Sequence, residues 1–303
     1  MKRAEQKGAD KEIHSTLEQL SHQNYETPAD ATGLAANLIE GVYPVNGLLE
    51  KDSWSAAHIG FGFYEIDAWG EQLIGASAPQ RCTLSGVAKR NSADAPHAVA
   101  NEFICARLGL LIGLPVPPGA VVTTGDGKLA YVSLRFGPKG EDPPPLSPKE
   151  FVEDNPSIAA GVIAFDCWIG NPDRHQHNLA YVRGDPRIPV TVFDHSHALL
   201  GIQAGAAVQL LRRRLDDPVV SGILRQYITS SREFRDWASR IRAVSSELIR
   251  DICRTMNHPD GISAEECSAA AEFLIHRKDR VLEQIWASKG RVPNVQQWEL
   301  DEN

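Results

Sequence analysis

A proline-rich stretch near the middle of the chain separates two halves of opposite character. Residues 140–148 contain three prolines in a row, Pro143 to Pro145, and such a run is stiff and extended. Short aromatic and β-branched segments separated by glycine precede it, whereas apolar residues at helical spacing follow it. The chain is therefore expected to be an α+β protein of two lobes, with a small antiparallel β-rich lobe followed by a larger helical lobe.

Several short strands and one helix are expected in the first half. Asp94 is suited to a helix N-cap, Pro96 falls in the first turn, and Gly113 with Pro115 ends the helix. A Gly-Asp-Gly turn separates the last two strands. The expected strands comprise residues 55–66, 72–74, 82–89, 120–123 and 129–134.

The second half is expected to be mainly helical. Residues 147–150 have the sequence of a capping box, with a serine N-cap, a proline at the first helical position and a glutamate at the third. Residues 157–170 are so apolar that a buried helix is predicted, with Trp168 in the core. Two long helices are predicted over 231–256 and 263–287, and the second opens with another capping box.

Composition and charge exclude two classes of function. The 303 residues include 31 Lys and Arg against 39 Asp and Glu, a net charge of −8, whereas proteins that wrap nucleic acid need clustered basic residues. No apolar run reaches the roughly 20 residues of a membrane span, because prolines interrupt the longest, 108–122. The N-terminal residues carry charge without an apolar segment, so no secretory signal is expected and a cytoplasmic location is predicted.

Three parts are expected along the chain. Residues 1–40 are polar and weakly patterned and form an extension of unassigned role. The β-rich N-lobe is placed at 41–140 and the helical C-lobe, which holds the polar loop described next, at 141–303. The five cysteines are scattered and lack a C-x-x-C pair, which is typical of reduced core thiols and not of a disulfide framework or a zinc knuckle.

A dense polar loop follows the predicted buried helix. Asp173 and Asn178 lie in it, and a short strand, a turn and a returning strand then lead to Asp194. A hairpin of this kind can return Asp194 to the neighbourhood of Asp173 and Asn178, while Arg174 is expected to brace the loop. Carboxylates, a carboxamide and several imidazoles are then gathered beside apolar segments, which is costly unless a ligand or a metal uses them.

The spacing of these residues is that of a kinase catalytic loop. Asp173 and Asn178 are five positions apart, as are the aspartate that receives the hydroxyl proton and the asparagine that holds a metal in protein kinases. A second metal ligand is required after the next hairpin, where Asp194 lies. A kinase-like site also needs a strand lysine and a helix glutamate. Lys89 ends an apolar strand and Glu102 lies near the middle of the following helix.

A set of segments carries a resemblance to a known family: Val87-Ala88-Lys89, Asn101-Glu102, 108–118, 165–178 and 193–199. Together they resemble the HipA-like kinases of bacteria, in particular the short single-chain members without a separate N-terminal module. The catalytic loop is also similar to that of phosphoinositide lipid kinases. After Asp194, His195 and Ser196 stand where protein kinases have Phe and Gly, so the Phe-dependent activation switch of those enzymes is not expected.

The resemblance implies a two-lobed kinase fold and phosphoryl transfer from ATP with Mg²⁺, commonly to a protein serine or threonine. The phosphate acceptor is a protein or a small molecule, and an antitoxin-type partner protein often accompanies this family. Residues 74–80 are a glycine-poor candidate for the phosphate-covering turn, and 131–136 are expected near the adenine. The implied site residues are Asp173, Lys89 and Glu102 for catalysis, Lys89, Gly75, Ser77 and Ser133 for ATP, and Asn178 and Asp194 for metal.

Two other interpretations stay open at this point. Residues 175–177 and 195–197 form two H-x-H pairs that, with Asp173 and Asp194, could build a zinc or dimetal site for hydrolysis. The predicted strand lysine and helix glutamate would then have no role. A pseudokinase that binds nucleotide or a partner without turnover is the third interpretation, and the intact set of kinase residues argues against it.

Overall fold

The computed structural model describes residues 64, 66–138, 142–185, 187–188 and 190–298. The chain divides into two compact units, Met1–Trp54 and Ser55–Asn303, and every described residue belongs to the second. The predicted extension at 1–40 and nearly all of the strand predicted at 55–66 lie outside the described residues. The predicted boundary between the lobes stays a prediction.

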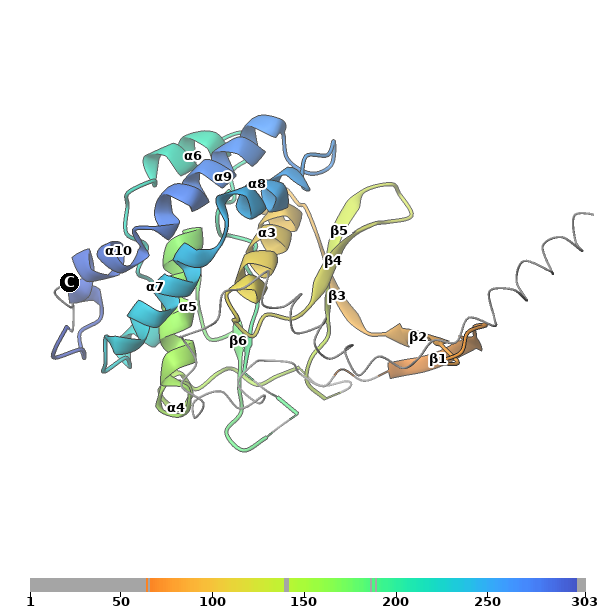
Figure 1. Cartoon of the computed structure of the whole chain (residues 1–303), viewed down its shortest axis with the longest axis horizontal. Helices are drawn as coiled ribbons and strands as arrows, with labels where there is room; N and C mark the ends of the chain where they lie inside the picture. Colours follow the sequence, from red (N-terminus) through yellow and green to blue (C-terminus); the bar gives the residue numbers. More distant parts are fainter. Residues whose placement is uncertain (1–63, 65, 139–141, 186, 189, 299–303) are drawn as a thin grey trace, which may run out of the picture. The chain divides into compact units, whose positions relative to one another are not determined.

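The first described half consists of two small antiparallel sheets and one helix (Figure 1). Strands β1 (Ile66–Gln72) and β2 (Gln80–Leu84) pair as a hairpin. Strands β3 (Gly86–Arg90), β4 (Gly119–Thr123) and β5 (Leu129–Leu134) form the second sheet in the order β3-β5-β4. Helix α3 (Ala98–Leu111) packs on this sheet and lies between it and the helices of the second half.

The strand predicted at 82–89 is two strands in different sheets. β2 ends at Leu84 and β3 begins at Gly86, where the chain passes close to β5. A Cβ on Gly86 would lie 2.7 Å from a methyl carbon of Val132, which no larger residue can accommodate without a shift of the neighbour. Glycine therefore allows β3 to start here without displacing Val132, and this long-range contact leaves no trace in the local hydrophobic pattern.

The predicted N-cap of α3 is also wrong. The helix begins at Ala98 with His97 as N-cap, because residues 92–95 form a turn before it. The first backbone N–H groups of a helix have no acceptor within the helix. In α3, the N–H of Val99 donates to the side-chain oxygen of Asn91, eight positions earlier in the chain, at 3.0 Å.

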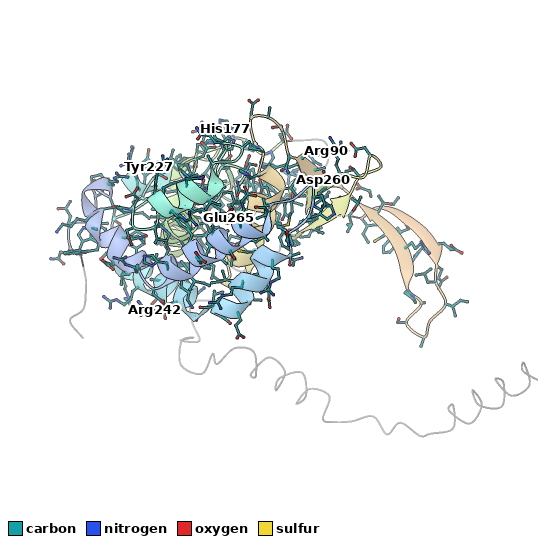
Figure 2. The ribbon with its side chains drawn as sticks, turned by 90° about the horizontal axis from the view of Figure 1, so that it is seen from above. Arg90, His177, Tyr227, Arg242, Asp260 and Glu265 are labelled. Atoms are coloured by element: carbon teal, nitrogen blue, oxygen red, sulfur yellow. The ribbon has the colours of Figure 1, made fainter. Side chains whose placement is uncertain are left out.

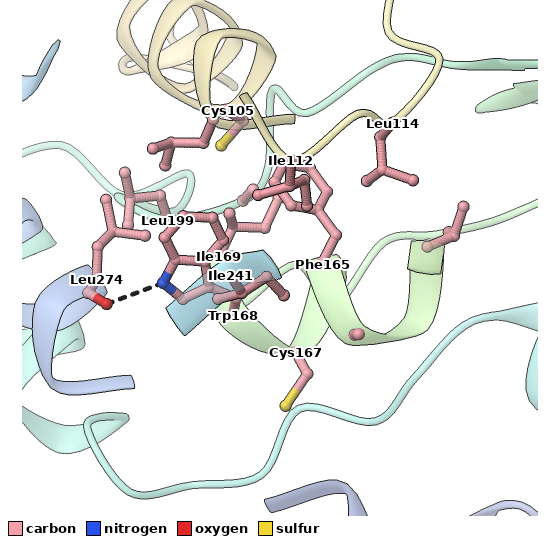
Figure 3. Close-up of a cluster of buried hydrophobic side chains, with 14 of the residues drawn as sticks. Cys105, Ile112, Leu114, Phe165, Cys167, Trp168, Ile169, Leu199, Ile241 and Leu274 are labelled. Carbon is pink, nitrogen blue, oxygen red and sulfur yellow. Dashed lines mark hydrogen bonds between the residues drawn. The ribbon is translucent and has the colours of Figure 1, made fainter. Parts of the chain in front are cut away.

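The second half is helical around the buried helix α5 (Pro156–Ile169), as predicted. Trp168 is fully buried and donates from its indole nitrogen to the carbonyl of Leu274 at 2.8 Å (Figure 3). Gly161 leaves room for the ring of Trp237, which a Cβ at that position would overlap. The other elements are α4 (Pro148–Asp154), β6 (Leu179–Ala180), β7 (Thr191–Val192), α6 (Ala207–Arg213), η1 (Ile223–Gln226), α7 (Arg232–Ala243), α8 (Ser246–Arg254), α9 (Ala264–Lys278), α10 (Val281–Ala287) and η2 (Lys289–Arg291).

The two long C-terminal helices predicted at 231–256 and 263–287 are each interrupted. The first breaks before Ser245, whose side chain caps α8 by accepting from the backbone of Glu247 at 3.2 Å. The second breaks between α9 and α10. The capping box of Ser263 and Glu266 is confirmed, whereas Ser147 makes no side-chain cap at the start of α4.

Four of the five cysteines are buried free thiols, as predicted, and Cys82 on β2 is exposed. Within the described ranges, none of the helices is both long enough and apolar enough to cross a bilayer.

Candidate functional site

A buried ion pair fixes the loop that follows α5. Arg174 donates from Nε and Nη2 to the two carboxylate oxygens of Asp166 at 3.0 and 2.9 Å, and the side chains are 1% and 2% exposed. The Nη1 atom of Arg174 donates to the backbone carbonyls of Asn178 and Phe193 at 3.0 and 2.7 Å. One guanidinium therefore connects α5 to the residue before β6 and the residue after β7, so Arg174 braces the loop as expected.

The hairpin expected after the loop is present and returns Asp194 to Asn178. β6 and β7 pair antiparallel with Leu179 opposite Val192, and the backbone N–H of Phe193 donates to the carbonyl of Asn178 at 3.2 Å. Asp194 follows directly, with a φ of 58°. Aspartate tolerates this left-handed conformation better than most residues.

The backbone around Asp173 is fixed from both sides. The side-chain oxygen of Asn171 accepts from the N–H of Asp173 at 3.1 Å, and the amide nitrogen of Asn178 donates to the carbonyl of Asp173 at 2.8 Å. The carboxylate of Asp173 faces two histidines: its Oδ2 lies 2.9 Å from Nδ1 of His197 and 4.0 Å from Nε2 of His175. The contact with His197 was not predicted as part of a kinase site.

A lysine from the sheet joins two carboxylates from other elements. The Nζ atom of Lys89, at the end of β3, lies 2.5 Å from Oε1 of Glu102 on α3 and 2.7 Å from Oδ1 of Asp194 after β7. Glu102 is the most buried of these three residues, with a side chain only 4% exposed. The strand lysine and helix glutamate expected from the sequence are therefore paired with each other and with the proposed metal ligand.

Two residues between Asp194 and the next helix complete this cluster. The hydroxyl of Ser196 lies 2.9 Å from both Oε1 of Glu102 and Oδ1 of Asp194, and Lys89 donates to it at 3.1 Å. The backbone N–H of His195 donates to Glu102 at 3.1 Å. The sequence predicted neither contact: His195 was expected as a departure from Phe-Gly or as part of an H-x-H metal pair, and Ser196 only as a departure from Phe-Gly. The position of both residues directly after Asp194 was the available signal.

The charges in the cluster shift the pKa values of its members. Burial raises the pKa of Glu102, but His195 and Lys89 outweigh burial and hold it well below its ordinary value. Burial also raises the pKa of Asp194, and the ammonium of Lys89 lowers it by more. Burial lowers the pKa of Lys89, whereas Glu102 and Asp194 raise it above its ordinary value. All three groups are therefore charged near neutral pH.

A cleft of about 460 Å³ opens beside these side chains. The predicted residues Lys89, Asp173, Asn178 and Asp194 all line it, while Glu102 lies behind Lys89. Figure 2 labels two further lining residues, Arg90 and His177. The complete lining is Lys89, Arg90, Ala95, Ala98, Asp173, His175, His177, Asn178, Asp194, Ser196 and His197.

The three other predicted ATP contacts do not line the cleft. Gly75 and Ser77 are exposed residues of the turn between β1 and β2. Ser133 is half-buried in β5, where it pairs with Val87 of β3 and with Gly119 of β4. The structure thus gathers the predicted catalytic and metal residues, but not these three.

One histidine of each H-x-H pair, His175 and His197, lies near Asp173, whereas His195 lies beside Glu102. The ring of His195 is fully buried beside Glu102 and packs edge-on against Phe165 with a centroid distance of 5.7 Å, whereas His175 and His197 are 45% and 44% exposed. In the described part of the chain, no three His, Cys, Asp or Glu side chains gather into a group that could hold a metal. This arrangement does not favour the histidine-bound metal centre of the hydrolase interpretation.

The solved structures to which this chain is similar include the following two. The proinflammatory kinase CtkA of Helicobacter pylori matches with a TM-score of 0.50 at 15% identity, over 77% of this chain and 97% of that chain. A chain of the Shewanella oneidensis MR-1 toxin–antitoxin complex of HipA, HipB and operator DNA matches with a TM-score of 0.38 at 14% identity, over 88% of this chain and 73% of that chain. No family model and no curated protein matches the sequence.

The likeness to CtkA establishes the fold alone. The chain has the two-lobed kinase-like fold predicted from its sequence, with small antiparallel sheets in one lobe and helices in the other. At the level of the fold, the predicted similarity to kinases is confirmed.

Proposed function

We propose that the chain is an ATP-dependent phosphotransferase of the HipA-like type that transfers phosphate from Mg-ATP to a serine or threonine of a protein. The observation that carries the proposal is the contact of Lys89 with both Glu102 and Asp194 at the wall of a cleft that also holds Asp173 and Asn178. This is the set of groups that phosphoryl transfer needs, and it is assembled from elements far apart in the sequence.

Lys89 is assigned to the nucleotide phosphates. Its ammonium offsets the charge of the α- and β-phosphates, and Glu102 holds it in position from the buried side. Residues 131–136, which comprise the end of β5 and the two residues after it, are proposed to border the adenine, as the resemblance implies. No role is assigned to Gly75 and Ser77, because both are exposed on the β1–β2 turn.

Asp173 is assigned to the acceptor hydroxyl. Its carboxylate lines the cleft on a loop braced by Arg174, and the hydrogen bond of 2.9 Å with His197 orients it. A carboxylate held in this way can accept the hydroxyl proton or orient the hydroxyl for attack on the γ-phosphate. Catalysis is then chiefly positioning and charge stabilisation.

The two oxygen donors Asn178 and Asp194 fit a Mg²⁺ ion, which prefers carboxylate and amide oxygens. Asn178 donates its amide nitrogen to the carbonyl of Asp173, so its Oδ1 remains for a cation. The contacts of Asp194 with other described residues all use Oδ1, which leaves Oδ2. When bound, the ion supplies charge neutralisation between the phosphate oxygens.

Calorimetric titration with a non-hydrolysable ATP analogue, with and without Mg²⁺ or Zn²⁺, tests this function. We expect nucleotide binding that requires Mg²⁺ and that is lost in Lys89→Met but retained in Lys149→Met, which removes an exposed lysine on α4. Tight Zn²⁺ binding without nucleotide binding would favour the hydrolase instead. Mg-ATP binding without phosphate transfer to any protein or to water would favour the pseudokinase.

A further inference from the structure

A second pocket lies against the loop that carries Asp173. It has a volume of about 550 Å³ and is built from η1, the residues before it and one residue of η2. Tyr227, labelled in Figure 2, follows η1 directly. The lining residues are Val220, Ser221, Gly222, Ile223, Arg225, Gln226 and Arg291.

Two contacts connect this pocket to the catalytic loop. The hydroxyl of Ser221 donates to the backbone carbonyl of Asn171 at 3.0 Å, and Asn171 in turn holds the N–H of Asp173. Gly222, with a φ of 87°, packs so closely on Arg174 that a Cβ would lie 2.9 Å from the Cβ of that arginine. The wall of the pocket and the loop that positions Asp173 are therefore in direct contact.

The pocket is lined by two arginines and by no carboxylate. Arg225 donates from Nη1 to the backbone carbonyl of Arg291 at 2.9 Å, which brings the two residues together. Among the described residues, neither guanidinium has a carboxylate within ion-pair distance, whereas Arg183 and Arg254 are paired with Asp154 and Asp251. A pocket with unpaired guanidinium groups in a chain of net charge −8 is suited to an anionic ligand.

We propose that this pocket binds an aspartate or glutamate side chain of the protein acceptor and thereby selects serine or threonine residues flanked by acidic residues. The inference rests on the proposed phosphotransferase function. Arg225 is three positions from Gly222, so its Cα lies within roughly 11 Å of the residue that contacts Arg174. An extended peptide advances about 3.3 Å per residue. In this proposal, an acidic side chain several positions from the acceptor serine or threonine occupies the pocket while the acceptor hydroxyl faces Asp173.

Fluorescence anisotropy with two labelled peptides tests the inference without requiring turnover. Both peptides contain one serine, and the flanking residues are glutamates in one and glutamines in the other. We expect the full-length protein to bind the glutamate peptide about tenfold more tightly, since charge-assisted hydrogen bonds are stronger than neutral ones. The preference should disappear in Arg225→Gln/Arg291→Gln and persist in Arg212→Gln/Arg250→Gln, which removes two exposed arginines outside the pocket.

Several outcomes would overturn the inference. The inference is wrong if the protein binds the two peptides equally or binds neither of them. It is also wrong if the preference for the glutamate peptide survives in Arg225→Gln/Arg291→Gln, or if a single-stranded oligonucleotide binds the same arginines more tightly than the glutamate peptide does. Because Arg291 has an exposed side chain, Arg291→Gln alone gives a second variant that should fold and should weaken the preference. Titration of Mg-ATP into the same samples separates the two proposals, since loss of nucleotide binding contradicts the kinase and loss of the glutamate preference contradicts only the acceptor pocket.

Discussion

Lys89 and Asp194 form an ion pair in which Nζ of the lysine lies 2.7 Å from Oδ1 of the aspartate. The lysine is the penultimate residue of strand β3 and the aspartate follows a hairpin of the helical half, so this contact joins the two halves of the site. It also places a positive charge on the carboxylate that is proposed to hold Mg²⁺. The free protein therefore keeps the negative charges of Asp194 and Glu102 compensated before any ligand arrives.

A double-mutant cycle measures this relationship. Lys89→Met leaves Glu102 and Asp194 without their shared cation and should lower the free energy of unfolding, and Asp194→Asn should lower it less. We expect a coupling energy of about 0.5–3 kcal/mol between the two positions, as for residues of one charged network. Urea unfolding of both single variants and the double variant gives the value, and a coupling energy near zero would show that the pair does not stabilise the free protein.

The same cluster predicts how stability depends on pH. The pKa values of Glu102 and Asp194 lie below their ordinary values of 4.5 and 3.8, so their contribution is present above those values and is lost as the pH falls through the lowered ones. The pKa of Lys89 lies above its ordinary value of 10.5, so its contribution is present below that value and is lost as the pH rises through the raised one. The unfolding midpoints of the wild-type protein and of Lys89→Met are compared over a pH series. The stability lost in Lys89→Met should be largest between the acidic limit set by Glu102 and Asp194 and the basic limit set by Lys89. A cost that is the same at every pH would contradict this assignment.

Arg174 should be far more important for stability than an exposed arginine. Arg174→Met leaves the carboxylate of Asp166 buried without its partner, which costs about 3–5 kcal/mol. Arg183→Met is the matched control, because Arg183 pairs with Asp154 at the surface and an exposed pair contributes about 1 kcal/mol or less. Equal losses in the free energy of unfolding would be inconsistent with the bracing role of Arg174.

Asp173 and His197 should affect turnover and not folding. Asp173→Asn keeps the volume but removes the base, so kcat for ATP turnover should fall about 10²–10⁴-fold. His197→Gln removes the partner that orients Asp173 and should lower kcat by a smaller factor at unchanged KM for ATP. His258→Gln, at an exposed position outside the cleft, is the control. A His197→Gln protein with wild-type kcat would remove this histidine from the proposed mechanism.

The residues that the sequence identifies are those whose roles are encoded in local spacing. Asp173 and Asn178 could be predicted because five positions separate them on one loop, and Asp194 because a hairpin follows. The fold class could be predicted because helical and strand periodicities occupy different halves of the chain.

Arg174 and Glu102 were predicted, but the other supporting residues could not be, because their roles depend on contacts between distant segments. Asp166 is an unremarkable polar residue of an apolar helix until it meets Arg174. His197 is one of several neighbouring histidines, and only the folded hairpin selects it as the partner of Asp173. The close approach of Gly86 to Val132 joins strands that are distant in the sequence, so no local pattern predicts it.

The central claim is that Asp194 holds the metal of Mg-ATP whereas Asp173 acts on the acceptor, and one calorimetric comparison tests it. Mg²⁺ with a non-hydrolysable ATP analogue is titrated into the wild-type protein, Asp173→Asn and Asp194→Asn, with Asp251→Asn as a surface control. We predict nearly unchanged affinity in Asp173→Asn and Asp251→Asn, and loss of Mg²⁺-dependent binding in Asp194→Asn. Full binding by Asp194→Asn, or loss of binding in Asp173→Asn, would contradict the account.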